Sequence, residues 1–588
     1  MSGRVMLWAN FRRGPSLAVP APYDDNSSPY WWLDRIGSWA RGWSRTGITD
    51  VLFPNPLKCQ GGAGKGDDGY GVFSDYDIGT LNQQGTKPTR FGTGDLLRRA
   101  IAICKANGLN VLLDYVPHQR MGGKNGVYRY VSATGKTNGR FPKDPGCFSP
   151  SAPGDTIPPY VHVDPVPDPA NNFAFGNPLA PVNSVPKGYV WNGLLEAGDW
   201  LFRTTGANGA RIDDTKGLAI QFAKAWMTYG AMRGKFFFGE YASGNPNDTN
   251  WWVSQVDGLA SSFDFGFHYN QAMIMCNDSS FDMSRLKNNW EAMYQTNPMK
   301  AVTFVESMDS DTNGFATIVF NKLLGYALML MSEGLPCVYI RDYLKEPDCY
   351  GLEDGINNLI WCAQMLAGGS TVPRLTNNAR VYVFERMGWG AAPGCVVALS
   401  NDYFYPGWHT VNVQTHFGPG VRLHDFTGHN AQDCWTDSNG RVTFGVPPAA
   451  NGVGFGIWGP ASMEGAVHQP PPGRSTLQDF DGADDLDIGP LTSASHYVGR
   501  VWAEAGTYIS VLMEPGTLEG FACEQRITSP DGLTLVSGKS THVYGRTKER
   551  GWHSVYAQML TGAAPTMPFT IHAEYTAPQT LDVSEFGS

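Results

Sequence analysis

The alternation of strand and helix patterns over residues 1–372 constrains the fold more than any other feature of the sequence. Short apolar runs are followed by segments with helical periodicity, and the connections between them are short. In one such unit, Thr93 is expected to cap a helix that extends to Asn107, and Gly108 suits the end of that helix. A buried strand follows at once and ends at Asp114. This sequence of elements is typical of a parallel sheet.

The strand pattern occurs eight times, and nearly every predicted strand is followed by a predicted helix. Eight strands in this arrangement predict the α/β class and a (β/α)₈ TIM barrel, whose active site lies on the loops after the strand ends. The predicted strands are Val5–Ala9, Ile48–Phe53, Val111–Asp114, Gly209–Asp213, Phe236–Glu240, Ser262–Phe267, Val302–Val305 and Pro336–Ile340. Further helices are predicted at Trp32–Trp43, Leu194–Phe202, Leu218–Met232, Phe315–Met331 and Ile356–Ala367.

Changes in composition divide the chain into domains. A stretch rich in Gly, Pro, Asn and Ser interrupts the barrel pattern after the third strand and predicts a loop-rich insertion. Short alternating strands begin near Arg380, and a run of prolines later predicts a stiff linker between two all-β domains. The predicted boundaries are 1–118 and 191–372 for the barrel, 119–190 for the insertion, 373–462 for an antiparallel β domain, 463–475 for the linker and 476–588 for a C-terminal β-sandwich with an accessory or carbohydrate-binding role.

The bulk properties exclude several classes of partner and cofactor. The net charge is −10 with no compensating basic stripe, which argues against nucleic acid. No apolar run is long enough to span a membrane. The ten cysteines occur without a Cys-x-x-Cys pair, which disfavours zinc and favours a reducing compartment. The N-terminal residues lack the features of a signal peptide, so we expect a cytoplasmic protein, with a trimmed secreted form as the alternative.

The stretch Gly209–Gly217 concentrates reactive side chains at one predicted strand end. Arg211 and Asp213 alternate with apolar residues on the strand, and Lys216 follows within the same short segment. Glu240 ends the next predicted strand. Two acids delivered by successive strand ends are what acid/base and covalent sugar chemistry requires.

At this point the chain resembles the α-amylase family of glycoside hydrolases, over roughly residues 4–460. Four separated motifs occur in the family's order, at the ends of predicted strands three, four, five and seven. They are Asp114–Gln119, Gly209–Gly217, Gly239–Tyr241 and Phe304–Asp309, with supporting matches at Gly69–Tyr76 and at Gly92 and Thr93.

The resemblance implies a retaining hydrolase that cleaves α-1,4-glucosidic bonds in starch- or glycogen-type α-glucans or maltooligosaccharides by double displacement. It implies that Asp213 is the nucleophile, that Glu240 is the general acid and base, and that Asp309 binds ring hydroxyls in the distorted sugar. A polysaccharide or oligosaccharide is the implied partner. Two alternatives remain open, which are a transglycosylase on the same scaffold and a non-catalytic glycan-binding protein.

Other matching residues are implied to support these three acids. Arg211 would hold the Asp213 carboxylate ionised and oriented, and Asp114 would hold Arg211. Tyr70 would stack under the sugar ring, and Lys216 would reach the leaving-group side. An Asp on a strand end has a plain alternative as a loop cap or surface ion-pair partner, and Lys216 has one as a solvated charge.

The chain departs from the family pattern at four positions of the motifs, one of which is Gly217 in place of a histidine. Gln119 and Met308 replace two histidines that normally bind sugar hydroxyls, and methionine cannot donate a hydrogen bond. These changes predict weaker binding of the transition state or a different substrate. His118 replaces the asparagine that commonly binds calcium, and imidazole is a poor ligand for that cation. We therefore expect no required cofactor and disfavour a structural calcium, although Gly217 retains the backbone carbonyl that the family uses.

Two groups of aromatic residues are candidates for glycan stacking. Trp251 and Trp252 follow the Glu240 strand, but adjacent residues face different ways, so at least one is expected in the core. In the last domain, an aromatic set offers either a glycan-binding face or an ordinary sandwich core, and we favour the core. This set comprises Trp502, Tyr508, Trp552 and Tyr556.

Overall fold

The computed structural model describes most of the chain. The described residues are 3–10, 31–64, 68–132, 135–149, 177–184, 186–311, 316–346, 349–474, 476–481, 493–514, 522–540, 542–561 and 570–576. Residues 150–176 of the predicted insertion lie outside this description, as does Phe315, where a helix is predicted to begin. The domain boundaries given above stay predictions.

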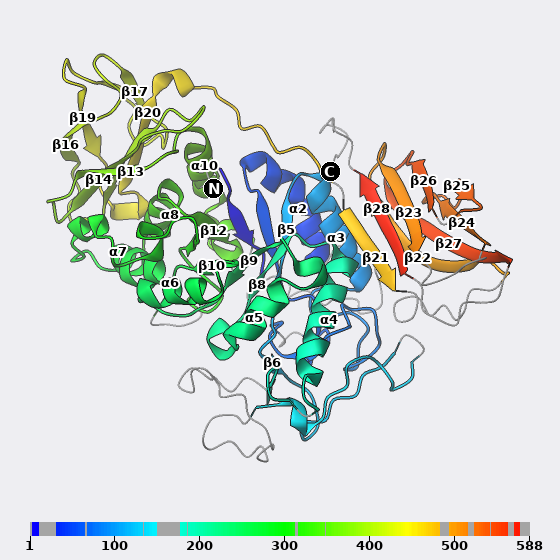
Figure 1. The fold of residues 1–588 in the computed structure, drawn as a ribbon. Helices are drawn as coiled ribbons and strands as arrows, with labels where there is room; N and C mark the ends of the chain where they lie inside the picture. Colours follow the sequence, from blue (N-terminus) through cyan, green and yellow to red (C-terminus); the bar gives the residue numbers. More distant parts are fainter. Residues whose placement is uncertain are drawn as a thin grey trace. The chain divides into compact units, whose positions relative to one another are not determined.

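Eight strands form a closed barrel, which confirms the predicted TIM-barrel fold (Figure 1). Around the barrel they follow the order β1-β12-β11-β10-β9-β8-β5-β2, and the registered neighbours pair in parallel. All eight correspond to predicted strands. Their bounds are Met6–Trp8 for β1, Asp50–Phe53 for β2, Asn110–Tyr115 for β5, Gly209–Ile212 for β8, Phe236–Gly239 for β9, Ala260–Phe263 for β10, Ala301–Phe304 for β11 and Leu335–Tyr339 for β12.

Helices follow most of the barrel strands. The best-defined start is that of α3, where the Thr93 hydroxyl accepts a hydrogen bond from the backbone N–H of Leu96 at 3.3 Å. Gly108 follows this helix with a φ of +79°, as its predicted position after the helix requires. The bounds are Trp32–Thr46 for α2, Gly94–Ala106 for α3, Tyr189–Thr205 for α4, Ile220–Met227 for α5, Pro246–Gln255 for α6, Met273–Asn277 for α7, Lys322–Met331 for α8, Ile340–Tyr343 for α9 and Glu353–Met365 for α10. Among the described residues, none of the helices has the length and apolar character that a membrane crossing needs.

The predicted strand Ser262–Phe267 is too long. Strand β10 ends at Phe263, because the buried carboxylate of Asp264 accepts backbone N–H bonds from Phe267 at 3.0 Å and from Met293 at 2.9 Å. These bonds turn the chain, and Phe267–Ala272 forms a π-helix instead. Burial raises the pKa of Asp264 to about 6.

Two predicted helices are also shorter in the structure. The segment predicted as one helix over Leu218–Met232 is α5, followed by a separate 3₁₀ turn at Gly230–Met232. Helix α8 begins at Lys322, after Asn321, whose side chain accepts a hydrogen bond from the N–H of Leu324 at 3.2 Å. A side-chain cap of this kind sets a helix start that periodicity alone does not reveal.

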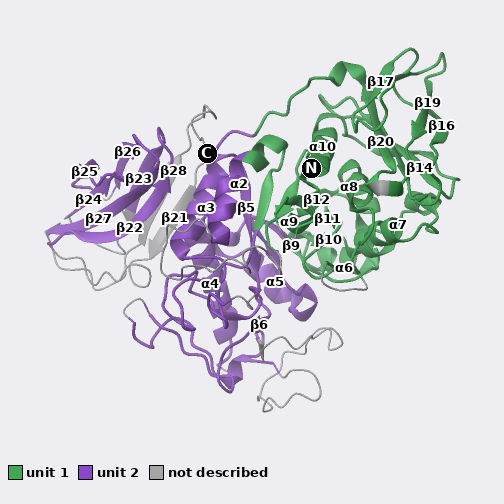
Figure 2. Cartoon of the chain, turned by 180° about the vertical axis from the view of Figure 1, so that it is seen from behind, with its two compact units in different colours: residues 1–15, 42–52, 238–470 green, residues 16–41, 53–237, 471–588 purple. Residues whose placement is uncertain are grey.

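The chain forms two compact units, each assembled from several segments (Figure 2). One unit comprises residues 1–15, 42–52 and 238–470, and the other comprises residues 16–41, 53–237 and 471–588. Both units contribute strands to the barrel.

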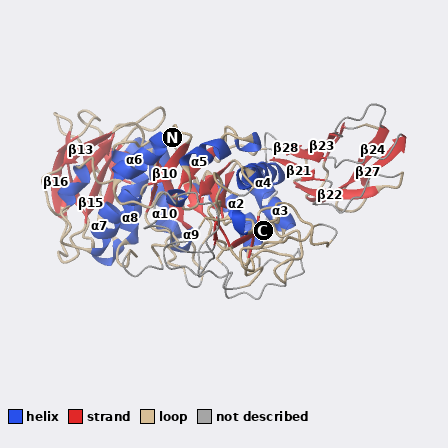
Figure 3. Ribbon diagram, turned by 60° about the horizontal axis from the view of Figure 1, so that its bottom comes forward, coloured by secondary structure: helices blue, strands red, loops and turns tan. Residues whose placement is uncertain are grey.

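The first unit contains the predicted antiparallel β domain. Figure 3 shows its strands beside α7 and α8. Strand β14 begins at Val381, close to Arg380, where short alternating strands are predicted to begin. Valines and the Trp458 indole form its core. The bounds are Thr371–Leu375 for β13, Val381–Arg386 for β14, Cys395–Ser400 for β15, His409–Gln414 for β16, Arg422–Asp425 for β17, Cys434–Trp435 for β18, Arg441–Val446 for β19 and Phe455–Pro460 for β20.

The second unit contains the C-terminal strands, which form two four-stranded antiparallel sheets. The sheet orders are β21-β28-β23-β26 and β22-β27-β24-β25. The bounds are Thr476–Asp481 for β21, His496–Ala503 for β22, Tyr508–Glu514 for β23, Ala522–Thr528 for β24, Thr534–Gly538 for β25, His542–Arg546 for β26, Gly551–Thr561 for β27 and Thr570–Thr576 for β28.

Helix α3 contacts β22 in this unit, and charged side chains join the two. Arg500 of β22 forms an ion pair with Asp95 of α3 at 2.6 Å. The Arg99 guanidinium lies 4.5 Å from the ring centre of Trp502. Trp502 therefore contacts a barrel helix and is 9% exposed, whereas Tyr508 is 51% exposed. The structure places these two members of the aromatic set in different surroundings.

We predict that Trp502→Ala weakens the attachment of the C-terminal sheets to α3. The variant loses the cation–π contact with Arg99 and the burial of a large aromatic side chain, which together stabilise by roughly 3–5 kcal/mol. Hydrogen exchange should then rise in β22 and in α3 together. Tyr508→Ala is the matched control, and an equal rise in both variants would contradict the docking role.

Candidate active site

Arg211 joins two carboxylates at the ends of neighbouring barrel strands. Its Nη1 atom lies 2.6 Å from Asp114 Oδ1 and 2.9 Å from Asp213 Oδ1. Arg211 is 1% exposed, Asp114 is fully buried and Asp213 is 7% exposed. The backbone N–H of Asp213 also donates to the carbonyl of Tyr115 at 2.9 Å. Asp213 is thus fixed through both its backbone and its side chain.

Tyr70 completes this cluster from a loop. Its hydroxyl donates to Asp114 Oδ2 at 2.5 Å and accepts a hydrogen bond from Arg211 Nη1 at 3.3 Å. The ring lies over the Arg211 guanidinium, with 5.6 Å between the guanidinium carbon and the ring centre. The structure therefore brings together Tyr70, Asp114, Arg211 and Asp213, as the sequence motifs predict.

Lys58 holds the segment around Tyr70 and was not recognised from the sequence. It lies in β3 (Lys58–Cys59), which pairs with β4 (Val72–Ser74) directly after Tyr70. Its buried Nζ donates to the carbonyls of Thr86 at 2.8 Å and Lys87 at 2.7 Å. Further contacts go to two more carbonyls and to the Asp77 carboxylate. Burial lowers the pKa of Lys58, and the Asp77 charge opposes that shift.

The chain turns sharply after Asp213. Asp214 has a φ of +39°, and its side chain accepts a hydrogen bond from the N–H of Gly217. The short 3₁₀ helix Thr215–Gly217 carries Lys216, which is half-buried. A left-handed conformation at a residue other than glycine is strained, and such strain is concentrated at functional sites.

His118 occupies the motif position that the sequence analysis considered as a possible calcium ligand. Its Nδ1 lies 2.9 Å from Gln119 Oε1 and 3.4 Å from Asp214 Oδ2, and its buried Nε2 has no hydrogen-bond partner. A Cβ added to Gly217 would lie 2.5 Å from that Nε2. Among the described residues, no cluster of three His, Cys, Asp or Glu side chains is arranged to hold a metal. An imidazole packed in this way does not fit a cation that prefers oxygen ligands.

Gln119 is turned toward the protein. It is 5% exposed, and its Nε2 donates to the Tyr70 carbonyl at 3.3 Å. Because Gln119 Oε1 contacts His118, both the oxygen and the nitrogen of the amide have partners in the protein. Its predicted role in substrate binding stays a prediction.

In the other unit, Glu240 follows β9 and is half-buried. The loop after it leads into α6, which carries Trp251 and Trp252. Trp252 is 1% exposed and stacks on Tyr241 with 6.3 Å between ring centres, whereas Trp251 is 49% exposed. One indole belongs to the core, as the argument from adjacent positions predicts, and only Trp251 presents an open ring.

Asp309 lies in a tight turn after β11. The turn is closed by the N–H of Asp311, which donates to the Ser307 carbonyl at 3.0 Å. The Ser307 hydroxyl accepts the N–H of Asp309 at 3.2 Å. Asp309 is exposed, whereas the preceding Met308 is fully buried. Position 308 therefore presents no side chain at the surface.

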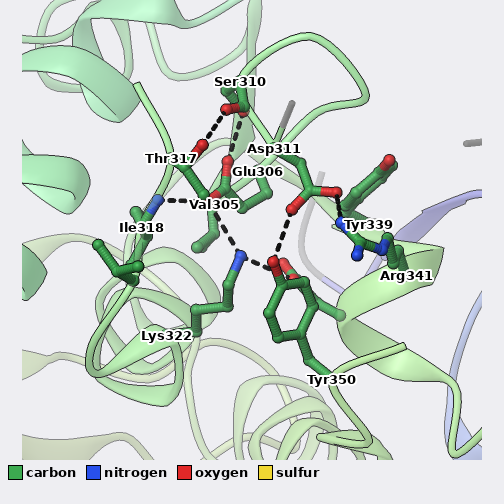
Figure 4. A network of polar contacts seen from close by, with 12 residues as sticks. Val305, Glu306, Ser310, Asp311, Thr317, Ile318, Lys322, Tyr339, Arg341 and Tyr350 are labelled. Carbon is green, nitrogen blue, oxygen red and sulfur yellow. Dashed lines mark hydrogen bonds and ion pairs between the residues drawn. The ribbon is translucent and has the colours of Figure 1, made fainter. Parts of the chain in front are cut away.

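Glu306 anchors this turn from below (Figure 4). One carboxylate oxygen accepts the N–H of Ile318 at 2.6 Å and pairs with Lys322 Nζ at 2.9 Å. The other oxygen accepts the hydroxyl of Ser310, and that hydroxyl in turn accepts the N–H of Ser307 at 2.8 Å. Glu306 thus reaches the backbone of the Asp309 turn through a single serine.

The same network extends to the far side of the turn. Lys322 Nζ also pairs with Asp342 at 2.9 Å and lies 4.2 Å from the ring centre of Tyr350. The Tyr350 hydroxyl donates to Asp311 at 2.9 Å, and Arg341 pairs with the same carboxylate (Figure 4). Both ends of the turn that presents Asp309 are therefore held by buried charged groups.

Comparisons with known proteins add to this geometry. A family model described as Alpha-amylase C-terminal matches residues 396–459. The α-amylase of Geobacillus stearothermophilus is 26% identical over 509 residues, covering 76% of this chain and 89% of that protein. The glucan 1,4-α-maltohexaosidase of Bacillus sp. strain 707 is 26% identical over 492 residues, covering 75% and 89%. The solved α-amylase of Anoxybacillus aligns with a TM-score of 0.56 at 17% identity, covering 78% of this chain and 98% of that one.

These relatives and the family model support the α-amylase family of glycoside hydrolases for this chain. The four sequence motifs lie at barrel strand ends three, four, five and seven. At two of the motif positions this chain has the buried Met308 and the imidazole of His118.

The charge of Glu306 depends on pH near neutrality. Burial raises the pKa of Glu306 to about 7, opposed by Lys322 and reinforced by Asp342. A carboxyl with a raised pKa in the folded state stabilises the protein fully below its unfolded pKa of 4.5, and this stability is lost as pH rises through 7.

We predict that Glu306→Gln removes part of the pH dependence of stability. Gln does not ionise, so wild type should lose unfolding temperature relative to the variant between pH 4.5 and 7. One pKa unit corresponds to about 1.4 kcal/mol, so the relative change is a few kcal/mol. Calorimetry from pH 4 to 9 measures it, with the half-exposed Glu464→Gln as control. Parallel curves for wild type and Glu306→Gln would refute the assignment.

Proposed function

We propose that this protein is a retaining hydrolase that cleaves α-1,4-glucosidic bonds in starch- or glycogen-type α-glucans. The observation that carries the proposal is the buried Arg211 bridge between Asp114 and Asp213 at one rim of the barrel. Strand β9, which ends next to Glu240, neighbours β8 in the barrel. The similarity to a glucan 1,4-α-maltohexaosidase supports the linkage.

The proposed reaction has two displacement steps. Asp213 attacks the anomeric carbon while Glu240 gives its proton to the leaving glycosidic oxygen, so one C–O bond breaks as another forms. Water then gives a proton to Glu240 and displaces Asp213 from the covalent glycosyl intermediate. Both acids return to their starting states, and the sugar keeps its anomeric configuration.

Arg211 and Asp309 prepare this chemistry in the proposal. The guanidinium beside Asp213 favours the ionised carboxylate and holds one of its oxygens in place, so the group is oriented before substrate binds. Asp309 stands exposed at the apex of a turn and suits a role in binding ring hydroxyls. Its interactions would strengthen as the ring distorts toward the transition state.

We predict that Asp213→Asn and Glu240→Gln each lower hydrolysis of maltoheptaose by at least ~10²-fold, because each variant loses a reacting group. Initial rates measure the loss, and proton NMR of freshly released sugar should show the α-anomer. Asp257→Asn, at an exposed position with a positive φ that asparagine tolerates, is the control. Full activity of Asp213→Asn would refute the proposed function.

The product profile separates hydrolysis from the two alternatives. Hydrolysis produces only shorter maltooligosaccharides, whereas a transglycosylase also produces longer ones when a sugar intercepts the intermediate. A glycan-binding protein without catalysis binds amylose and releases no product. Amylose, pullulan, dextran and sucrose compared side by side also define the linkage.

We propose further that activity needs no calcium or other cofactor, and that the protein works in the cytoplasm on a saccharide substrate without nucleic-acid or membrane partners. The packing of His118 against Gly217 supports the first point. None of the ten cysteines forms a disulfide, which supports a reducing compartment.

We predict that chelation leaves this protein unchanged. Dialysis against EDTA should alter neither the unfolding temperature nor the rate on maltoheptaose, because the imidazole occupies the position of the usual oxygen ligand. A fall in either quantity that added Ca²⁺ reverses would contradict the prediction. Mg²⁺ added in place of Ca²⁺ controls for ionic strength.

A further inference from the structure

The π-helical turn Phe267–Ala272 carries a tyrosine toward the candidate site. This turn follows β10, and π-helical turns occur frequently at functional sites. Tyr269 lies in its middle and is half-buried. Its ring stacks on Phe265 with 6.0 Å between ring centres. The side chain is therefore oriented by packing, while part of it stays accessible.

The residues on either side of Tyr269 bind the two segments that carry Glu240 and Asp309. His268 Nδ1 donates to the carbonyl of Val305 at 2.7 Å, on the stretch that leads to Asp309. Asn270 donates to the carbonyl of Gly244 at 2.7 Å, on the loop that begins at Glu240. Burial lowers the pKa of His268 to about 4, so the ring stays neutral and donates through Nδ1.

Tyr269 itself contacts the loop after Glu240. A Cβ added to Gly244 would lie 3.8 Å from Tyr269 Cδ2, so the ring rests against this glycine. Burial raises the pKa of the Tyr269 hydroxyl, and the negative charges of Asp309, Glu240 and Glu306 raise it further. The hydroxyl consequently keeps its proton near neutral pH and can act as a hydrogen-bond donor.

The position next to Asp309 offers no such donor. Met308 is fully buried, and a thioether cannot donate a hydrogen bond in any case. Among the described residues, the Tyr269 hydroxyl forms no hydrogen bond with the protein, which leaves it available to a ligand.

We propose that Tyr269 is a substrate-binding residue whose hydroxyl donates a hydrogen bond to the α-glucan between Glu240 and Asp309. This inference rests on the proposed function, because it takes these two acids as the catalytic groups on this side of the site. The donor reaches the sugar from the end of β10, in place of the side chain before Asp309.

The test compares Tyr269→Phe with Tyr294→Phe. Tyr294 donates its hydroxyl to Gln271 of the same π-helical turn at 3.1 Å, so its loss perturbs the support of the turn without removing the proposed donor. For Tyr269→Phe we expect kcat/KM on maltoheptaose to fall roughly three- to tenfold, the size of one hydrogen bond between neutral groups. Tyr294→Phe should stay within twofold of wild type. Equal losses in the two variants would show a purely structural role and overturn the inference.

Binding without turnover separates this inference from the proposed function. In the Asp213→Asn background, calorimetry with maltoheptaose should show weaker binding when Tyr269→Phe is added. An inactive Asp213→Asn protein that binds equally well with and without the hydroxyl overturns the role of Tyr269 alone. An Asp213→Asn protein with full activity refutes the proposed function instead.

Discussion

The buried ion pairs of Arg211 are the interaction on which the candidate site depends. Two carboxylates and one guanidinium are removed from water here, and desolvation makes such a cluster costly unless every member is satisfied. Asp114 gains a second hydrogen bond from Tyr70, and Asp213 is also tied through its backbone to Tyr115. Without Arg211, two carboxylates would be buried without their cation. The folding of this rim and the placement of Asp213 therefore both depend on the ion pairs of Arg211.

Buried lysines perform the same task for the loops that surround the rim. Lys58 gathers the carbonyls of one loop around its ammonium group, and Lys322 joins Glu306 to Asp342 beneath the Asp309 turn. Lys143, in the predicted insertion, pairs with the buried Asp75 at 2.6 Å. A bound metal ion can organise loops in this way, but here covalently attached cations do so. Burying these cations costs desolvation free energy, and for this reason the pKa of Lys143 is lowered to about 8.

The sequence predicted the barrel and the main members of the site because both leave local signals. Strand periodicity, the Thr93 cap and four motifs in register identify elements whose partners lie nearby in the chain or at known strand ends. The partners of Lys58 and Lys322 are separated from them by 16–30 residues, and a lysine in the sequence does not reveal what its ammonium group contacts. The π-helix after β10 was missed for a similar reason. Asp264 redirects the backbone by accepting N–H groups of distant residues, so an apolar run that matches a strand ends early.

The burial of Met308 and the π-helical turn are connected. His268 stacks on Phe304 with 5.2 Å between ring centres and binds the carbonyl of Val305, so the chain before Met308 is packed from the side of β10. A methionine, apolar and flexible, suits the buried position that this packing leaves. A histidine there would bring a polar ring into the core, where it would need hydrogen-bond partners. If Tyr269 supplies the missing donor, the sugar is approached from a neighbouring strand end and at a different angle. Specificity among α-glucans would then depend on the position of the donor. A site built around one hydroxyl donor rejects a ligand that cannot accept its hydrogen bond.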